Sequence, residues 1–180
     1  RLQVKGTQLV NSSGKKVQLR GISTHGLSWY PEYVNQSAFT FMKKNWKVNA
    51  VRLAMYTAEY NGYCTGDASN RRKLEACIDN GVKYATNAGM YVIIDWHILS
   101  DGNPQQNQKE ALKFFKKMAK KYKNNTNVIY EICNEPNGGT SWSTIKKYAE
   151  KIIKGMIYRK IRVLCGAFCG TPPEKARFHF

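Results

Sequence analysis

Apolar runs recur along the chain at intervals of roughly 40 residues, and a helical pattern follows each run. The runs that we predict to be strands are residues 19–23, 48–55, 90–96 and 128–133. The apolar residues between them recur at helical spacing, near residues 37–45, 74–85, 112–122 and 145–152. Repetition of strand and helix is typical of parallel strands joined by helical crossovers. Alternation around Asn11–Gly14 also predicts a hairpin within residues 1–20.

Polar side chains at the strand ends distinguish between an open doubly wound sheet and a (β/α)₈ barrel. Each run ends in polar or aromatic residues: Thr24 and His25, Arg52, Asp95 to His97, then Asn134 and Glu135. Consecutive strands that feed one rim are how a barrel builds its active site. A doubly wound sheet more often carries a glycine-rich turn after its first strand, and this sequence has none there. The sequence therefore favours a barrel.

Composition limits the classes of function. The chain has 180 residues, enough for one domain, and a formal charge of +17. Its lysines are spread along the predicted helices without a nucleic-acid-binding motif, so we interpret them as a solvated basic surface and expect no nucleic-acid partner. No run approaches the ~18 apolar residues of a membrane span, so we expect no membrane partner. The first residues resemble the start of a mature domain.

The five cysteines lack zinc-site spacing. Cys165 and Cys169, four residues apart, could form a metal pair or a disulfide, but we favour coincidence. Cys77 and Cys133 fall on apolar faces and are predicted to be small core residues. Cys64 could pair with Cys77 only if the intervening loop folds back, which the sequence leaves open.

Residues 132–136 carry the most specific chemistry. Glu135 follows a buried run and Asn134, and Pro136 then ends the strand because proline cannot donate to a ladder. Such a carboxyl group suits a general acid that cleaves a sugar acetal, a reaction that needs two carboxyl groups. Its pKa must be raised for this role, and we expect Trp96 and Tyr130 to shield it. The alternative is a solvated loop glutamate.

Four ordered segments together resemble glycoside hydrolase family 5, most of all its bacterial-type endoglucanases. They are residues 19–27, 52–56, 94–97 and 132–136. The resemblance covers about residues 1–153, which we take as the N-terminal part of a catalytic domain. It implies a (β/α)₈ barrel, retaining double-displacement cleavage of the β-1,4-glucan cellulose, and no cofactor or metal. Secretion follows from the polymeric substrate, which cannot enter a cell.

The resemblance also assigns roles to individual residues. Glu135 matches the acid/base, and Asn134 matches the residue that hydrogen-bonds the sugar 2-hydroxyl. Arg52 matches the arginine that holds the nucleophile carboxylate, which suits its planar, permanently charged fork. A structural ion pair to a neighbouring strand is the alternative for Arg52.

Two histidines and two aromatic residues complete the match. His25 and His97 match histidines near the reacting sugar, although either could instead be a core histidine bonded to backbone. Trp29 and Tyr56 match aromatic residues that face sugar rings. Trp29 could also be a packing anchor.

Other residues receive simpler interpretations. Asp95 and His97 suggest a metal site, but no third ligand is evident. Trp142 could line the cleft or pack at a helix start. We expect Glu59 and Asp101 to be solvated loop acids, and Trp46 and Phe115 to be core residues.

The pattern breaks in the last part of the chain. A (β/α)₈ barrel usually needs ~250 residues, and this sequence supplies only about four βα units. In the family the nucleophile is a second glutamate after strand seven. Glu174, the last acid here, lies in a proline-containing segment unlike a strand end, so we assign no nucleophile. We favour a frameshifted terminus for residues 154–180; the alternative is a diverged fifth strand at 161–164.

A half barrel would leave strand edges unpaired, so we expect self-association through these edges. Because no nucleophile is assigned, we also expect little or no hydrolytic activity of the chain in isolation. Rival functions remain. A related barrel enzyme could act on mannan, xylan or another β-glucan. A catalytically dead remnant could bind cello-oligosaccharides without cleaving them. A basic nucleic-acid binder would show salt-sensitive binding instead.

Overall fold

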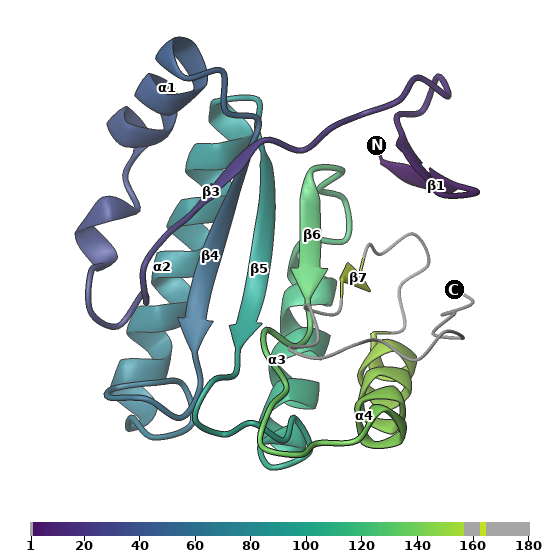
Figure 1. Ribbon diagram of the computed structural model, residues 1–180. Coiled ribbons are helices and arrows are strands. Elements are labelled where there is room, and N and C mark those ends of the chain that lie inside the picture. The colour runs from purple at the N-terminus through teal and green to yellow at the C-terminus, as the bar shows by residue number, and fades with distance from the viewer. Residues whose placement is uncertain (1, 157–162, 165–180) are drawn as a thin grey trace.

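The computed structural model describes residues 2–156 and 163–164 of the chain. Its main sheet has five parallel strands whose spatial order follows the chain, as the numbering in Figure 1 shows. The strands are β3 (Gly21–Ser23), β4 (Ala50–Tyr56), β5 (Tyr91–His97), β6 (Val128–Glu131) and β7 (Val163–Leu164). A doubly wound sheet reverses its strand order at a switch point, and this one does not. The prediction of barrel-type βα units is confirmed.

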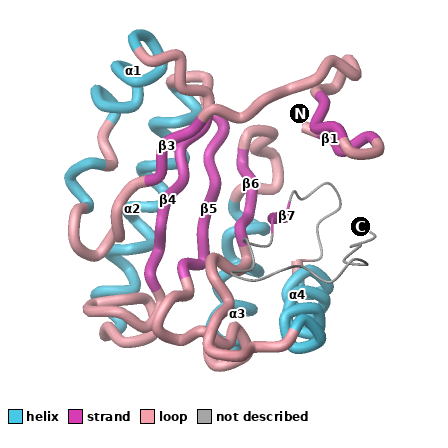
Figure 2. Tube along the Cα trace, in the orientation of Figure 1, coloured by secondary structure: helices cyan, strands magenta, loops and turns pink. Residues whose placement is uncertain are grey.

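A helix follows most strands and packs on one face of the sheet (Figures 1 and 2). The helices are the 3₁₀ turn η1 (Pro31–Tyr33), α1 (Gln36–Asn45), α2 (Ala68–Asn87), α3 (Gln108–Lys121) and α4 (Trp142–Gly155). Side-chain oxygens of Asn35, Asp67 and Ser141 accept backbone N–H groups at the starts of α1, α2 and α4. These caps satisfy donors that the first helical turn leaves without partners, and so fix where each helix begins. None of the described helices is long and apolar enough to cross a bilayer.

The N-terminal hairpin turns earlier than the sequence predicts. β1 (Gln3–Lys5) and β2 (Gln8–Val10) pair antiparallel around Gly6, which takes a positive φ of 59°. A second turn does form at Asn11, whose side-chain oxygen accepts the N–H groups of Ser13 and Lys15. Only an isolated bridge between Val10 and Lys16 follows it. The predicted turn is present, but the regular ladder lies before it.

The hydrophobic core fills the layer between the sheet and the helices. Trp96 on β5 is fully buried and contacts the rings of Phe114 and Phe115 on α3. Phe115 is therefore a core residue, as predicted. Cys133 is also buried in this core, and Cys77 packs against it partly buried. Cys64 and Cys77 are free thiols, so no disulfide joins them.

Trp46 is not a core residue, which corrects the sequence prediction. Its side chain is 61% exposed and packs edge-to-face on the half-exposed ring of Phe41. Helical spacing placed it on the same face as the buried Phe39, but α1 ends at Asn45 and Trp46 is its C-cap. The next residue, Lys47, turns the chain with a positive φ of 58°. The apolar face of α1 therefore does not continue as far as Trp46.

The other face of the sheet carries the polar side chains of the strands. Paired residues of parallel strands point to the same face, and the register pairs Ser23 with Arg52 and Asp95 with Glu131. In Figure 1 the helix α2 lies behind β4 and β5 and α3 lies behind β6, and this second face is turned toward the viewer. It corresponds to the inside of a barrel.

β7 pairs parallel with β6 through Tyr130 and Glu131. It lies where the fifth-strand interpretation of the tail expects a strand. Cys165, Cys169 and Glu174 fall outside the described residues, so both interpretations of residues 154–180 stay predictions.

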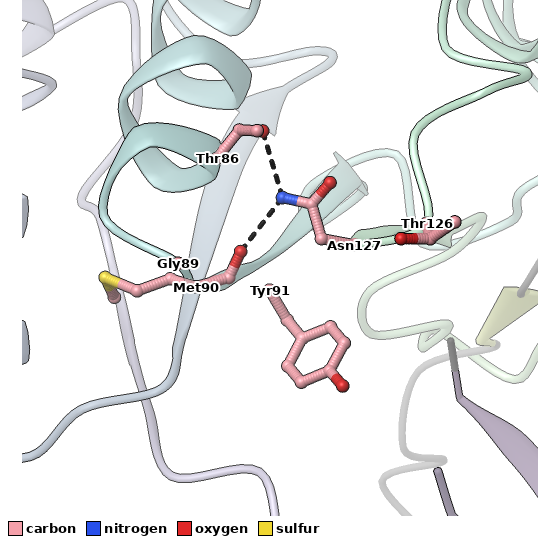
Figure 3. Close-up of a pocket in the computed structure, with 6 residues that line it drawn as sticks. All are labelled: Thr86, Gly89, Met90, Tyr91, Thr126 and Asn127. Carbon is pink, nitrogen blue, oxygen red and sulfur yellow. Dashed lines mark hydrogen bonds between the residues drawn. The ribbon is translucent and has the colours of Figure 1, made fainter. Parts of the chain in front are cut away.

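A pocket of about 340 Å³ lies between the turns that lead into β5 and β6 (Figure 3). Across it, the amide nitrogen of Asn127 donates to Thr86 Oγ1 and to the carbonyl of Met90. These residues precede the strands, at the face where barrels keep residues for stability rather than catalysis. The pocket is therefore a structural junction, and the polar strand ends at the opposite face form the candidate site.

Candidate active site

Arg52 is the centre of a polar cluster at the carboxyl ends of the strands. Its Nε donates to Glu131 Oε2 at 2.7 Å and its Nη2 to Glu131 Oε1 at 3.0 Å, a bidentate pair. The same Nη2 lies 2.9 Å from Asp95 Oδ2 and 2.7 Å from Asn134 Oδ1. Burial alone would lower the pKa of Arg52, but the hydrogen bond to Glu131 and the charges of Asp95 and Glu131 raise it. Arg52 therefore stays charged and ties three strands together.

The other end of the guanidinium is held loosely. Its Nη1 has two long contacts, 3.4 Å to Ser23 Oγ and 3.3 Å to His97 Nδ1. The ion pair that the sequence offered as an alternative is thus present, and Nη1 still has hydrogens for a stronger acceptor. The sequence reasoning missed Glu131, although an acid inside a buried apolar run signals a buried charge that needs a partner.

Asp95 is fully buried beneath this cluster. Its Oδ2 lies 2.6 Å from His97 Nδ1, and its Oδ1 has no partner among the described residues. Burial raises the pKa of Asp95 to about 6, although the hydrogen bond to His97 and the charge of Arg52 act in the opposite direction. The metal interpretation gains no third ligand, because the described residues contain no group of three or more His, Cys, Asp and Glu side chains arranged for a metal.

Glu135 projects from the loop after β6 and is exposed. Its carboxylate has no hydrogen-bond partner among the described residues. The side-chain nitrogen of Asn137 donates to the backbone carbonyl of Glu135 at 2.9 Å. The charge of Glu135 contributes to the raised pKa of Tyr56, after burial and the charges of Glu59 and Asp95. Glu135 thus directly follows Asn134, whose side chain belongs to the Arg52 cluster, and it is open to water.

Trp96 and Tyr130 do not shield Glu135, contrary to our expectation. Tyr130 Oη donates to the carbonyl of Met118 on α3, and Trp96 packs on Phe114. Successive side chains of a strand point to opposite faces. Trp96 is next to Asp95 and Tyr130 is next to Glu131, and since both acids point into the barrel, both rings point toward the helices.

Four ring side chains gather at the rim, as the resemblance predicts. The ring of Tyr56 lies 4.0 Å from that of His97, 4.8 Å from Trp29 and 6.3 Å from His25, centroid to centroid. Trp29 remains half-buried, and His25 is exposed. Gly26 permits this packing, because a Cβ there would lie 2.3 Å from the indole. The rings thus come from the loop after β3 and from the last residues of β4 and β5, and Trp29 is anchored by packing as well.

Asp101 and Glu59 are not solvated acids, which corrects a second prediction. Asp101 is 2% exposed and accepts hydrogen bonds from Thr57 Oγ1 at 2.8 Å, Asn107 Nδ2 at 2.9 Å and Leu99 N at 3.1 Å. Half-buried Glu59 accepts from the backbone of Ser100. Together they fasten the loop after β5 to the end of β4. The sequence shows loop acids but not the donors that fold around them.

The same loop also supports the segment that carries Glu135. Asn137 donates its side-chain N–H to the carbonyl of Leu99 and its backbone N–H to that of Gly102. Trp142, the first residue of α4, is half-buried, and both interpretations of it remain open.

We expect Asp101→Ala to lower the free energy of unfolding by about 3 kcal/mol, because it leaves three buried donors without an acceptor. Urea denaturation measures this loss. Asp101→Asn, which keeps one acceptor oxygen, should lose less, and Glu150→Ala on the exposed side of α4 should lose almost nothing. An Asp101→Ala loss as small as that of Glu150→Ala would contradict the role of Asp101 as a loop fastener.

A rim with two histidines and an Asn-Glu pair lies at the carboxyl ends of these parallel strands, which is where a (β/α)₈ barrel builds its active site. A family model described as "Cellulase (glycosyl hydrolase family 5)" matches residues 10–157. The chain belongs to glycosyl hydrolase family 5.

Named relatives agree with this assignment. Endoglucanase A of Butyrivibrio fibrisolvens is 49% identical over 153 residues, which are 85% of this chain and 36% of that protein. An endoglucanase of Clostridium saccharobutylicum is 48% identical over 153 residues, 84% of this chain and 33% of that protein. The chain thus spans about a third of the length of these relatives.

Solved structures agree as well. Cellulase Cel5C_n superposes with a TM-score of 0.88 at 40% identity, over 93% of this chain and 54% of that one. The catalytic domain of Thermobifida fusca endoglucanase Cel5A gives a TM-score of 0.85 at 40% identity, over 93% of this chain and 53% of that one. A variant of that domain was solved in complex with cellotetraose. This chain therefore matches about half of a known barrel domain.

Proposed function

We propose that the chain is the acid/base half of a secreted endo-β-1,4-glucanase, which cleaves internal bonds of cellulose by retaining double displacement. The observation that carries this proposal is the convergence of Glu135, Asn134, Arg52 and His97 on one rim beside the ring of Tyr56. The endoglucanase relatives support glucan as the substrate class.

Each rim group has a chemical task in this proposal. Glu135 gives a proton to the leaving-group oxygen and later takes one from water. Asn134 binds a hydroxyl of the reacting sugar. The rings of Tyr56 and Trp29 pack against the apolar faces of glucose. His25 offers a further polar group to its hydroxyls.

The second carboxylate must come from outside the described residues. Asp95 and Glu131 both face the barrel interior, but both are bound to Arg52. Glu131 is held in a bidentate ion pair, which engages its lone pairs, and Asp95 is fully buried, so neither is placed to act as the nucleophile. The loosely held Nη1 of Arg52 is the group left to hold the missing carboxylate.

We therefore expect the purified 180-residue chain to release no sugar from carboxymethyl-cellulose above the level of its Glu135→Gln variant. Reducing-sugar release over a day at 37 °C measures this. Turnover by the chain that disappears in Glu135→Gln would show that a nucleophile is recruited from the tail or a second copy.

A chimera tests whether the half barrel is catalytically competent. Residues 1–156 of this chain would replace the matching segment of Butyrivibrio fibrisolvens endoglucanase A, to which the chain is 49% identical. We expect the chimera to hydrolyse carboxymethyl-cellulose, because the partner half supplies the missing strands. A folded but inactive chimera would favour the rival interpretation of a sugar-binding remnant.

The open sheet edge also predicts self-association. Among the described residues, β3 pairs only with β4. The outer edge of β3 can therefore pair with a strand of a second molecule. Sedimentation velocity at increasing concentration should show a shift from monomer to larger species. A sharp monomer at all concentrations would contradict this expectation.

A further inference from the structure

Asp95 is a buried acid for which the proposed reaction has no direct use. It touches His97 and Arg52 through one oxygen, Oδ2, and solvent does not reach it. We propose that Asp95 is a positioning residue that holds His97 in its Nδ1–H tautomer and thereby fixes the side-chain amide of Asn134. This inference deepens the proposed function, because it explains how one sugar-binding group of that site is oriented.

The distances decide which hydrogen bond the His97 Nδ1 atom makes. Asp95 Oδ2 lies 2.6 Å from Nδ1 and can only accept when ionised, whereas Arg52 Nη1 lies 3.3 Å away and can only donate. The shorter contact has the length of a charge-assisted bond and outweighs the longer one. Nδ1 therefore carries the hydrogen, and Nε2 is left with a lone pair.

That lone pair determines the orientation of Asn134. The amide nitrogen of Asn134 lies 3.2 Å from His97 Nε2 and 3.0 Å from the carbonyl of Ile98, so both of its hydrogens have acceptors. Its oxygen accepts from Arg52 Nη2 at 2.7 Å. A flipped amide would set its nitrogen against the guanidinium and its oxygen against a carbonyl. Asn134 consequently keeps an acceptor position on its oxygen for a hydroxyl that donates.

The contacts form a closed ring from Asp95 to His97, Asn134, Arg52 and back to Asp95. Every donor in the ring meets an acceptor only if His97 has the Nδ1–H tautomer. The opposite tautomer would point a hydrogen at the amide nitrogen of Asn134, where a second donor already stands.

His25 provides an internal comparison. Its Nδ1 accepts the backbone N–H of Gly26 at 2.7 Å, so His25 should have the Nε2–H tautomer. The chain contains one further histidine, His179, whose signals a His179→Gln background removes. Two histidines of opposite tautomer are then expected in one spectrum.

The test is a long-range ¹H–¹⁵N correlation spectrum of the imidazole rings in the ¹⁵N-labelled 180-residue chain at pH 7.5. We expect the Nδ1–H pattern for His97 and the Nε2–H pattern for His25. Asp95→Ala should convert His97 to Nε2–H, because Arg52 then donates to Nδ1, while His25 is unchanged. Asp95→Asn, which keeps one acceptor oxygen, should restore much of the Nδ1–H form. The indole signal of the buried Trp96 reports whether each variant is folded.

An Nε2–H pattern for His97 in the unmodified chain would overturn the proposal, and this measurement needs no variant. A folded Asp95→Ala chain that keeps the Nδ1–H form would also overturn it. In a cellotetraose titration, Asp95→Ala should weaken binding about tenfold, the equivalent of one hydrogen bond. If His97 has the expected tautomer but the unmodified chain binds no cellotetraose, the positioning role stands and the proposed function fails.

Discussion

Replacing Glu135 with Gln should lower the kcat of the chimera for carboxymethyl-cellulose by about a thousandfold, with little change in KM. General acid–base catalysis contributes roughly 10²–10⁴ to such rates, and Gln keeps the size and polarity of Glu without a transferable proton. KM should hold because Glu135 is exposed and bonded to no other described side chain, so its loss leaves the rim intact. Initial rates of reducing-sugar release at pH 6 measure both constants.

The matched control is Glu150→Gln, an exposed glutamate of α4 that lies away from the rim. It should leave kcat within twofold of the unmodified chimera. A Glu135→Gln variant that retains a tenth of the activity would refute the acid/base role, and the search for the acid would move to another rim carboxylate.

Removing Arg52 should produce the largest loss of stability. Asp95 and Glu131 are neighbours in the strand register, and Arg52 is the cation bound to both. Breaking a buried ion pair by removing one partner lowers the free energy of unfolding by about 3–5 kcal/mol, because the remaining charges stay buried without compensation. We expect a loss of that size for Arg52→Ala in urea denaturation at pH 7.5. Arg52→Lys keeps the charge but not the bidentate fork, so its loss should be smaller.

Acid should reduce the effect of Arg52→Ala. The folded pKa of Asp95, about 6, lies above its unfolded value of 3.8, so the folded chain binds this proton more tightly. The stabilising contribution of that proton is fully present below pH 3.8 and is lost as the pH rises through 6. Without Arg52 the carboxyl is easier still to protonate, so the loss measured at pH 4.5 should be smaller than at pH 7.5. Equal losses at the two pH values would contradict the buried ion-pair account.

The strand order and the rim were predictable because both follow from local pattern. An apolar run fixes a parallel strand, and the residues after it must lie at the carboxyl edge of the sheet. His25, His97 and Asn134 were predicted at that edge and lie there, whereas Arg52 lies inside β4 and its guanidinium reaches His97 and Asn134. Their catalytic and binding roles stay predictions.

The partners of these residues were not predictable, because they depend on tertiary contacts. In the sequence, Glu131 is a single acid within an apolar run. Only the pairing of the strands brings it to Arg52. Asp101 was predicted to be a solvated loop acid, but two donors of its own loop and the distant Thr57 hydroxyl enclose it. Trp46 was misplaced for a local reason, since helical periodicity does not state where a helix ends.

A cellotetraose titration of the ¹⁵N-labelled 180-residue chain tests most directly whether the rim is a glucan-binding half site. The tryptophans give indole signals from separate places: Trp29 at the rim, the exposed Trp46 at the C-cap of α1, Trp96 in the core and Trp142 at the start of α4. We expect the Trp29 indole and the His97 ring signals to shift together, with a Kd on the order of 1 mM. Trp46 and Trp96 should stay unmoved. Shifts confined to Trp46, or none at saturating cellotetraose, would contradict the account.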